Sequence, residues 1–136
     1  MNRFSKTVPG VVKEFRPHHE DDLEWQEPGF PEPMTYAEAE VAIKKLNDEK
    51  FGGTDTWRLP VVEEEFLLAD RTTLDPAIDT KSFPTCKSGA YWTSSPDPSV
   101  PDCVFVVNFY HGSVLLGYRY YRCRVRAVRS VSRASQ

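Results

Sequence analysis

The sequence contains little cysteine, which limits how the chain can be stabilised. Its 136 residues include three cysteines, Cys86, Cys103 and Cys123, an odd number with no Cys-x-x-Cys pair. A disulfide framework needs a larger and even set, and a structural zinc site needs paired ligands at short spacing. We therefore expect reduced thiols, no bound metal ion and no cofactor.

Long apolar runs are also missing. Stretches such as Cys103 to Val107 are far shorter than the roughly 20 residues that a transmembrane helix needs. The residues from Met1 to Lys6 lead into Pro9-Gly10 and not into an apolar signal segment. These absences predict no membrane insertion and a location in the cytoplasm or in a phage virion. The length and the hydrophobic content of 40% predict a single domain with one core.

Acidic residues are absent from the last part of the chain. The last one is Asp102, and it is followed by Arg119, Arg122, Arg124, Arg126, Arg129 and Arg133. The segment from His18 to Glu24 has the opposite bias, so we expect the two ends to attract each other. A formal net charge of −3 and a pI near 5.6 argue against binding to nucleic acid.

Two segments have the pattern of helices. Thr35 and Glu38 form the capping box that opens a helix, and apolar residues recur at helical spacing as far as about Glu49. Phe51-Gly52-Gly53 is expected to end this helix, because glycine adopts the left-handed backbone of helix C-termini. A second helix is expected after Pro60, with acidic residues 63–65 near the positive end of its dipole.

Other segments are rich in β-branched and aromatic residues and are expected to be extended: Val8 to Phe15, Ala90 to Thr93, Val104 to Tyr110, Ser113 to Leu116 and Tyr118 to Val128. The order of these elements predicts an α+β fold, with two helices packed on a twisted antiparallel sheet that has long loops. We divide the chain into an N-terminal strand and acidic lead-in (1–22), a domain (23–130) and a polar tail (131–136).

Short motifs follow one another along the chain in a fixed order: Leu23-Glu24-Trp25-Gln26, Thr35-Tyr36, Trp57-Arg58-Leu59-Pro60, Tyr91-Trp92-Thr93-Ser94-Ser95, Asn108-Phe109 with Gly112, and Val125-Arg126-Ala127-Val128-Arg129. As an ordered set they resemble the Lcl C-terminal domain family of collagen-like adhesins. The resemblance covers about 23–130 and implies a C-type-lectin-like fold, which formylglycine-generating enzymes share.

The sequence departs from this family at two positions. Many relatives have one cysteine in the first helix and one in the terminal motif, where this chain has Ile43 and Ala127. If those two cysteines form a disulfide in the relatives, this chain lacks both cysteines of that disulfide. Their joint absence favours a reducing compartment over secretion.

Five residues of these motifs are expected to be structural: Trp25, Trp57, Arg58, Trp92 and Arg126. The tryptophans are expected in the core, because large aromatic side chains gain most from burial. A guanidinium inside a domain needs carboxylate or carbonyl partners, and we expect Glu65 or Asp70 to pair with Arg58.

The sequence lacks the usual catalytic patterns. No Gly-x-Ser-x-Gly accompanies the three histidines, and the Glu-Pro-Asn or Gln-Pro-Asp ligands of calcium-dependent lectins are absent. An enzyme of the formylglycine-generating type needs a pair of reactive cysteines that bind copper, for which Cys103 and Cys123 are the candidates. Buried, unreactive thiols are the simpler expectation. We therefore expect no catalytic residues and no enzymatic activity.

Tyrosine and arginine dominate residues 117–124, and both residue types are common at recognition hot spots. We predict a noncatalytic module that binds a protein, or else a glycan, through Tyr110, His111, Tyr118, Arg119, Tyr120, Arg122 and Arg124. The alternative is an ordinary strand, whose tyrosines cover a sheet while its arginines face water.

Two narrower hypotheses also fit the sequence. One is a small intracellular protein, encoded by a phage, that inhibits a host complex. The other is the diversified ligand-binding protein of a retroelement, because such proteins resemble this chain in placing variable positions on a C-type-lectin-like scaffold. The sequence leaves the partner and the oligomeric state open.

Overall fold

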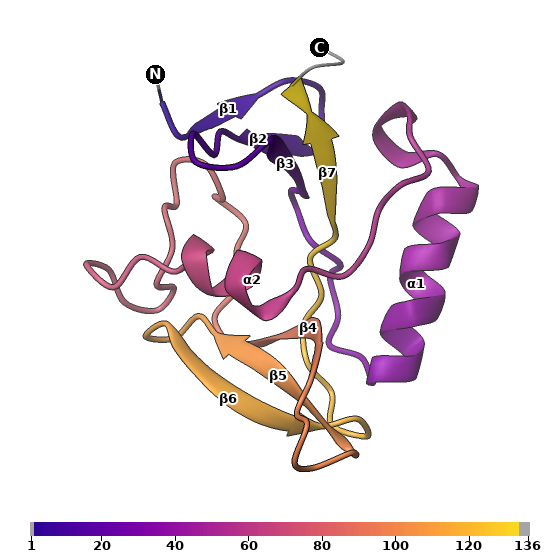
Figure 1. Cartoon of the computed structure of the whole chain (residues 1–136). Coiled ribbons are helices and arrows are strands. Elements are labelled where there is room, and N and C mark those ends of the chain that lie inside the picture. Colours follow the sequence, from indigo (N-terminus) through magenta and orange to yellow (C-terminus); the bar gives the residue numbers. More distant parts are fainter. Residues whose placement is uncertain (1, 134–136) are drawn as a thin grey trace.

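The chain forms two antiparallel sheets with two α-helices beside them, as a computed structural model of residues 2–133 describes (Figure 1). The first sheet has the strand order β1-β2-β3-β7 and comprises β1 (Phe4–Lys6), β2 (Val11–Glu14), β3 (Asp21–Gln26) and β7 (Val128–Ser132). The second sheet has the order β4-β5-β6 and comprises β4 (Ala90–Pro96), β5 (Cys103–Asn108) and β6 (Ser113–Tyr118).

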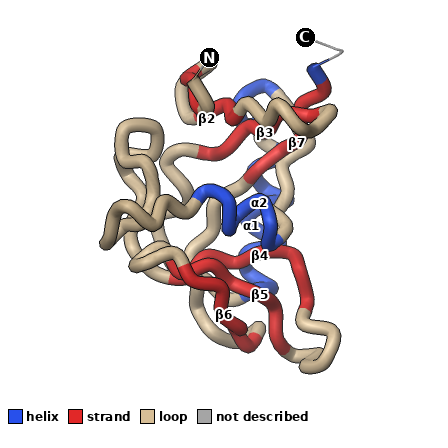
Figure 2. Tube along the Cα trace, turned by 60° about the vertical axis from the view of Figure 1, so that its left-hand side comes forward, coloured by secondary structure: helices blue, strands red, loops and turns tan. Residues whose placement is uncertain are grey.

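The helices are α1 (Tyr36–Asp48) and α2 (Val62–Leu68), and a short 3-10 helix, η1 (Phe51–Gly53), follows α1. Figure 2 shows the two sheets at opposite ends of the molecule, with the helices between them. The predicted α+β class is confirmed, although the strands form two sheets and not one. Among residues 2–133, no helix is long and apolar enough to cross a membrane.

The first helix begins and ends where the sequence predicts. The Thr35 hydroxyl accepts a hydrogen bond from the Glu38 N–H at 3.3 Å, and the Glu38 carboxylate accepts one from the Thr35 N–H at 2.9 Å. These two bonds satisfy backbone donors that have no partner inside the helix. At the other end Lys50 adopts a left-handed conformation with φ of 51°, and η1 follows.

We expect Thr35→Ala to lower the free energy of unfolding by about 1 kcal/mol, because it removes one arm of the capping box. Thr35→Ser keeps the hydroxyl and is expected to keep most of the stability. Urea denaturation of the three proteins measures the difference. Equal midpoints for Thr35→Ala and the wild type would contradict a stabilising role for the cap.

The predicted strand from Tyr118 to Val128 is wrong. β6 ends at Tyr118, and the next strand, β7, begins only at Val128. Between them the chain crosses from the second sheet to the first, and its backbone bonds to several unrelated segments. Cys123 pairs with Met34, for example, and the Arg124 carbonyl accepts from the Trp92 N–H at 3.0 Å. No single neighbouring strand is available along this crossing, so no long strand forms.

The two ends of the chain meet in the first sheet. β7 pairs with β3, so positions 131 and 132 of the predicted polar tail belong to a strand. Positions 134–136 of that tail lie outside the described residues. β1 and β2 complete the same sheet, and the boundary drawn at Leu23 falls inside β3. The predicted attraction between the ends is confirmed by ion pairs of Arg129 with Glu24 and of Arg133 with Asp22.

The three tryptophans lie in the core, as predicted. Trp57 and Trp92 pack in one cluster with the buried side of α1, and Trp25 packs in a second cluster with residues of α2 and β5. Each indole N–H has an acceptor: the Glu14 carboxylate for Trp25, and backbone carbonyls for Trp57 and Trp92. These bonds allow complete burial without an unsatisfied donor.

Candidate functional site

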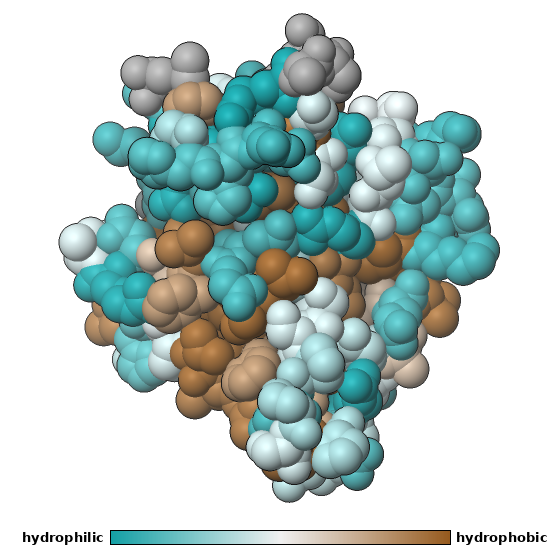
Figure 3. All heavy atoms as spheres, in the orientation of Figure 1, coloured by the Kyte–Doolittle hydropathy of each residue, from teal (hydrophilic) through white to brown (hydrophobic). Residues whose placement is uncertain are grey.

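Exposed apolar side chains gather on the β5-β6 hairpin and the turn after it. Of the twelve large hydrophobic or tyrosine side chains exposed among the described residues, seven belong to this region: Tyr110, Val114, Leu115, Leu116, Tyr118, Tyr120 and Tyr121. We call these seven residues the hairpin surface. Figure 3 shows hydrophobic atoms gathered over β5, β6 and α2. A concentrated exposed apolar patch of this kind marks a candidate interaction site.

Three tyrosines of the hairpin surface contact one another, and we call Tyr118, Tyr120 and Tyr121 the tyrosine cluster. The Tyr118 and Tyr120 rings stack with centroids 5.5 Å apart, and the Tyr121 ring meets them edge-on at 5.5 and 5.2 Å. The Tyr121 N–H donates to the Tyr118 carbonyl at 2.8 Å and closes the turn between them. The cluster therefore presents preassembled aromatic area, with the Tyr120 side chain as its most exposed member.

The predicted arginines surround the cluster and contact other parts of the chain. Arg119 lies over the Tyr36 ring at 4.7 Å, and Arg122 pairs with Glu38 at 3.3 Å. Arg124 donates to a backbone carbonyl of the loop before α1. These contacts join the turn after β6 to the start of α1. The Arg122 pair is exposed, so it contributes little stability and is readily exchanged for another acidic partner.

The structure divides the predicted site residues into two groups. Tyr110 and His111 lie at the turn between β5 and β6, with ring centroids 5.9 Å apart. The tyrosine cluster and its arginines lie at the other end of β6. A strand rises about 3.4 Å per residue, so the six residues of β6 keep the groups well apart within one chain. Residues 119–127 form no strand, so the tyrosines and arginines do not alternate along a strand as the alternative supposed.

Sequence reasoning missed part of this surface. Val114, Leu115 and Leu116 are exposed, although an uncharged apolar run is more typical of a buried strand. Tyr121 was also omitted, although it neighbours two predicted residues. Exposure of these side chains depends on β6 lying at the edge of its sheet, which no local pattern reveals.

Arg58 has a different partner from the two predicted. Its guanidinium forms two parallel hydrogen bonds to the Glu64 carboxylate, at 2.8 and 2.9 Å, and a third to the Ser130 hydroxyl. Burial raises the pKa of Glu64, but its bonds to Arg58 and to the Val61 N–H outweigh burial and hold the pKa below its usual value. Glu65, one position further along α2, is on the buried side of the helix instead, and Asp70 bonds to Thr72. The Arg58 donors are therefore used in contacts within the fold.

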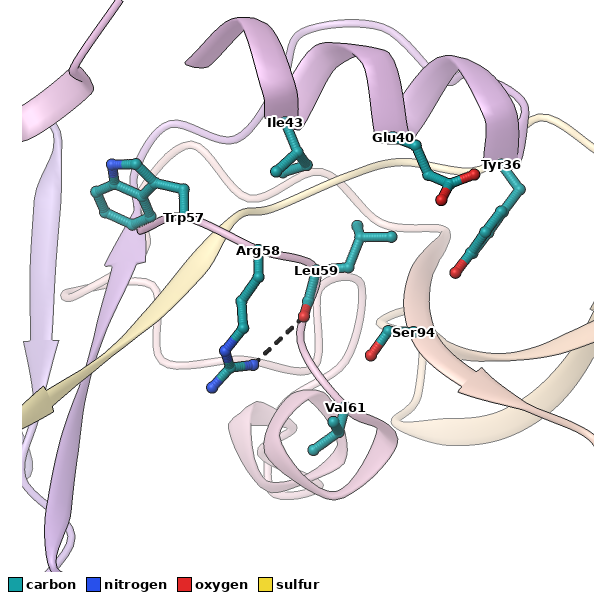
Figure 4. Close-up of a pocket in the computed structure, with 8 residues that line it drawn as sticks. All are labelled: Tyr36, Glu40, Ile43, Trp57, Arg58, Leu59, Val61 and Ser94. Carbon is teal, nitrogen blue, oxygen red and sulfur yellow. Dashed lines mark hydrogen bonds between the residues drawn. The ribbon is translucent and has the colours of Figure 1, made fainter. Parts of the chain in front are cut away.

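A groove of about 450 Å³ lies between α1 and the segment that leads into α2 (Figure 4). It is lined by Tyr36, Glu40, Ile43, Trp57, Arg58, Leu59, Val61 and Ser94. Apolar side chains share this lining with the polar groups of Glu40, Arg58 and Ser94. Arg58 reaches the groove, but its donors already bond to Glu64, Ser130 and the Leu59 carbonyl. The guanidinium is thus poorly placed to bind a ligand there.

Three ionisable side chains that interact with one another are buried: Arg126, Glu27 and Glu65. Arg126 is 2% exposed, donates to the Gln26 carbonyl at 2.6 Å and lies 3.7 Å from a Glu27 carboxylate oxygen. Its guanidinium also stands over the Phe83 ring. Glu65 is fully buried, and its carboxylate oxygens have no hydrogen-bond partner among the described residues. Burial raises the pKa of Glu65 to about 8, so this group is mainly protonated at pH 7 and leaves Arg126 paired with Glu27.

The three cysteines differ in burial, and Cys86 is the half-buried one. Cys103 and Cys123 are buried, and none of the three cysteines forms a disulfide. Burial raises the pKa of the Cys123 thiol to about 11, which disfavours the reactive thiolate. In the part of the chain that the structure describes, no three His, Cys, Asp or Glu side chains are grouped so that they could hold a metal ion.

Comparison with known families adds one finding. The sequence profile described as the Lcl C-terminal domain matches residues 17–129, which is well over half of the chain. The function of this family is unknown. The comparison with curated proteins gives no match.

Proposed function

The chain belongs to the Lcl C-terminal domain family, and from that premise we propose that it is a noncatalytic module that binds a protein partner through the tyrosine cluster and the arginines beside it. The observation that carries this proposal is the concentration of seven of the twelve exposed large apolar side chains on the hairpin surface. Such concentration in one hairpin and the turn after it is more than scattered exposure would produce.

The chemistry of the cluster favours a protein partner. Tyrosine buries a large area while only two side-chain torsions are fixed, and mutual ring contacts already restrict these three side chains. Arg119, Arg122 and Arg124 add positive charge around the rings. A matching surface would combine apolar side chains with carboxylates at its rim.

A glycan is the second candidate. Tyr120 is 72% exposed, and an aromatic ring that is this open can pack against the apolar C–H face of a sugar. The arginines would then bind hydroxyl or acidic groups of the same ligand. We propose no catalysis, because Cys103 and Cys123 are both buried and burial raises the pKa of the Cys123 thiol to about 11.

Replacing all three tyrosines of the cluster by serine is expected to remove partner binding. The measurement is a quantitative pull-down from a whole-cell lysate and from cell-envelope extract, run together with a glycan array. A matched control carries Val41→Ser, Leu67→Ser and Leu74→Ser, which remove exposed apolar side chains elsewhere. Circular dichroism must show that both variants are folded.

We expect the control to keep every specific partner of the wild type and the cluster variant to lose at least about tenfold in affinity, which corresponds to about 1.4 kcal/mol. Retention of the same partners by the cluster variant would overturn the proposal. A glycan bound on the array, with no protein captured, would select the second candidate.

A further inference from the structure

β6 lies at the edge of its sheet. It pairs with β5 on one side, and no other strand of the described residues pairs with its second side (Figures 1 and 2). The opposite edge of the same sheet is covered, because the Trp92 and Ser94 N–H groups of β4 donate to the carbonyls of Arg124 and Pro60. An edge strand with free backbone groups can pair with a strand of another chain.

The hydrogen-bond pattern identifies which backbone groups of β6 point outward. The Arg119 N–H donates to the Asp102 carbonyl at 3.0 Å and continues the β5-β6 ladder by one pair. In an antiparallel ladder, every second residue bonds to the same neighbour. Leu115 therefore bonds toward β5, while Val114 and Leu116 direct their N–H and C=O groups away from it. No hydrogen bond described for residues 2–133 satisfies those four groups.

Nothing in β6 opposes pairing with another strand. Edge strands are usually protected by charged side chains, proline or a bulge. The six residues from Ser113 to Tyr118 include no charge and no proline, and their register with β5 is continuous. Val114, Leu115 and Leu116 are 37%, 47% and 44% exposed.

We propose that two copies of this chain associate through β6, in antiparallel register about a two-fold axis at Leu115. This register places Val114 opposite Leu116 of the second copy, and Leu116 opposite its Val114. The outward N–H and C=O groups of Val114 and Leu116 in each β6 are then bonded, and the two Leu115 side chains face each other. The match is self-complementary, as a two-fold interface requires, because the apolar residues Val114, Leu115 and Leu116 of one copy meet the same three residues of the second copy.

The same register unites the two groups of predicted site residues. Because the two strands run in opposite directions, the β5-β6 turn of each copy lies at the end where β6 of the second copy leads into its tyrosine cluster. This register brings no carboxylate and no pair of arginines face to face, so charge does not oppose the pairing. Each end of the paired strands would then combine one hairpin turn with one tyrosine cluster. The dimer is inferred from the β6 edge and does not depend on the proposed binding function.

Sedimentation velocity of the full chain, from micromolar to millimolar concentration, tests the dimer. We expect a concentration-dependent dimer for the wild type and a dissociation constant weakened roughly tenfold or more in each of two variants. Leu116→Pro removes an outward N–H and leaves the β5-β6 hydrogen bonds in place. Leu115→Lys sets two like charges at the axis. Val41→Lys, on the exposed side of α1, is the matched control and is expected to keep the dimer.

Circular dichroism establishes the fold of each variant, and Leu115→Lys keeps the test valid if Leu116→Pro does not fold. A wild-type chain that stays monomeric at every concentration would overturn the proposal and would leave the β6 edge to a strand of a different protein. A dimer unaffected by both β6 substitutions would overturn it as well, because the contact would lie elsewhere. Sedimentation requires no ligand, so its result is separate from that of the pull-down.

Discussion

Replacement of Arg126 by methionine is expected to lower the free energy of unfolding by about 3–5 kcal/mol, measured by urea denaturation at pH 7. The arginine is 2% exposed and lies 3.7 Å from the Glu27 carboxylate, which is itself buried. Methionine fills much of the same space but leaves that carboxylate without its cation. It also removes the 2.6 Å hydrogen bond to the Gln26 carbonyl.

Two further variants show whether the loss arises from an unpaired buried charge. Adding Glu27→Gln to Arg126→Met removes both charges and is expected to recover much of the stability. Arg122→Met removes an arginine of an exposed ion pair and is expected to cost less than about 1 kcal/mol. Equal stability of Arg126→Met and Arg122→Met would contradict the structural role of the buried pair.

The second large effect is a loss of stability as the pH rises, caused by Glu65. Burial raises the pKa of its side chain from the usual 4.5 to about 8 in the folded protein. Between these values the folded chain holds a proton that the unfolded chain releases, so unfolding becomes easier as the pH increases. The contribution is fully present below pH 4.5 and is lost as the pH approaches 8. The total change is on the order of 5 kcal/mol, at about 1.4 kcal/mol per pKa unit.

Glu65→Gln isolates this contribution from the other titrating groups, because glutamine has a similar shape and does not ionise in this range. We expect the variant to be the more stable protein at pH 8 and its advantage to shrink as the pH falls toward 5. Urea denaturation at several pH values gives both curves. Curves that run parallel from pH 5 to 8 would show that Glu65 does not titrate with a raised pKa.

Local patterns predicted much of the fold. The capping box at Thr35 determines the start of α1, because its bonds join residues only three positions apart. The end of α1 was also predicted, but the left-handed residue there is Lys50 and not one of the glycines that follow. Burial of the tryptophans follows from their size and apolar character, and the confirmed ion pairs between the chain ends follow from the separation of charge along the sequence. The family, too, could be identified from the order of its motifs.

Predictions failed where the answer depended on which segment lies beside which. The residues after Tyr118 have a strand-like composition, yet they cross between two sheets and find no continuous partner. Arg58 pairs with Glu64 and not with Glu65, because the rotation of α2 turns one carboxylate toward it and buries the next.

For the candidate site, too, the sequence predicted the composition but not the arrangement in space. The sequence by itself determined that tyrosine and arginine would be concentrated near the C-terminus, since this is a matter of composition. Only the tertiary structure decided that three of these tyrosines form a cluster, that Tyr110 and His111 stand at the far end of β6, and that the strand between them lies at a sheet edge. The physical reason is that edge position follows from long-range strand pairing, and the exposure of side chains depends on which distant segments cover the two faces of the sheet.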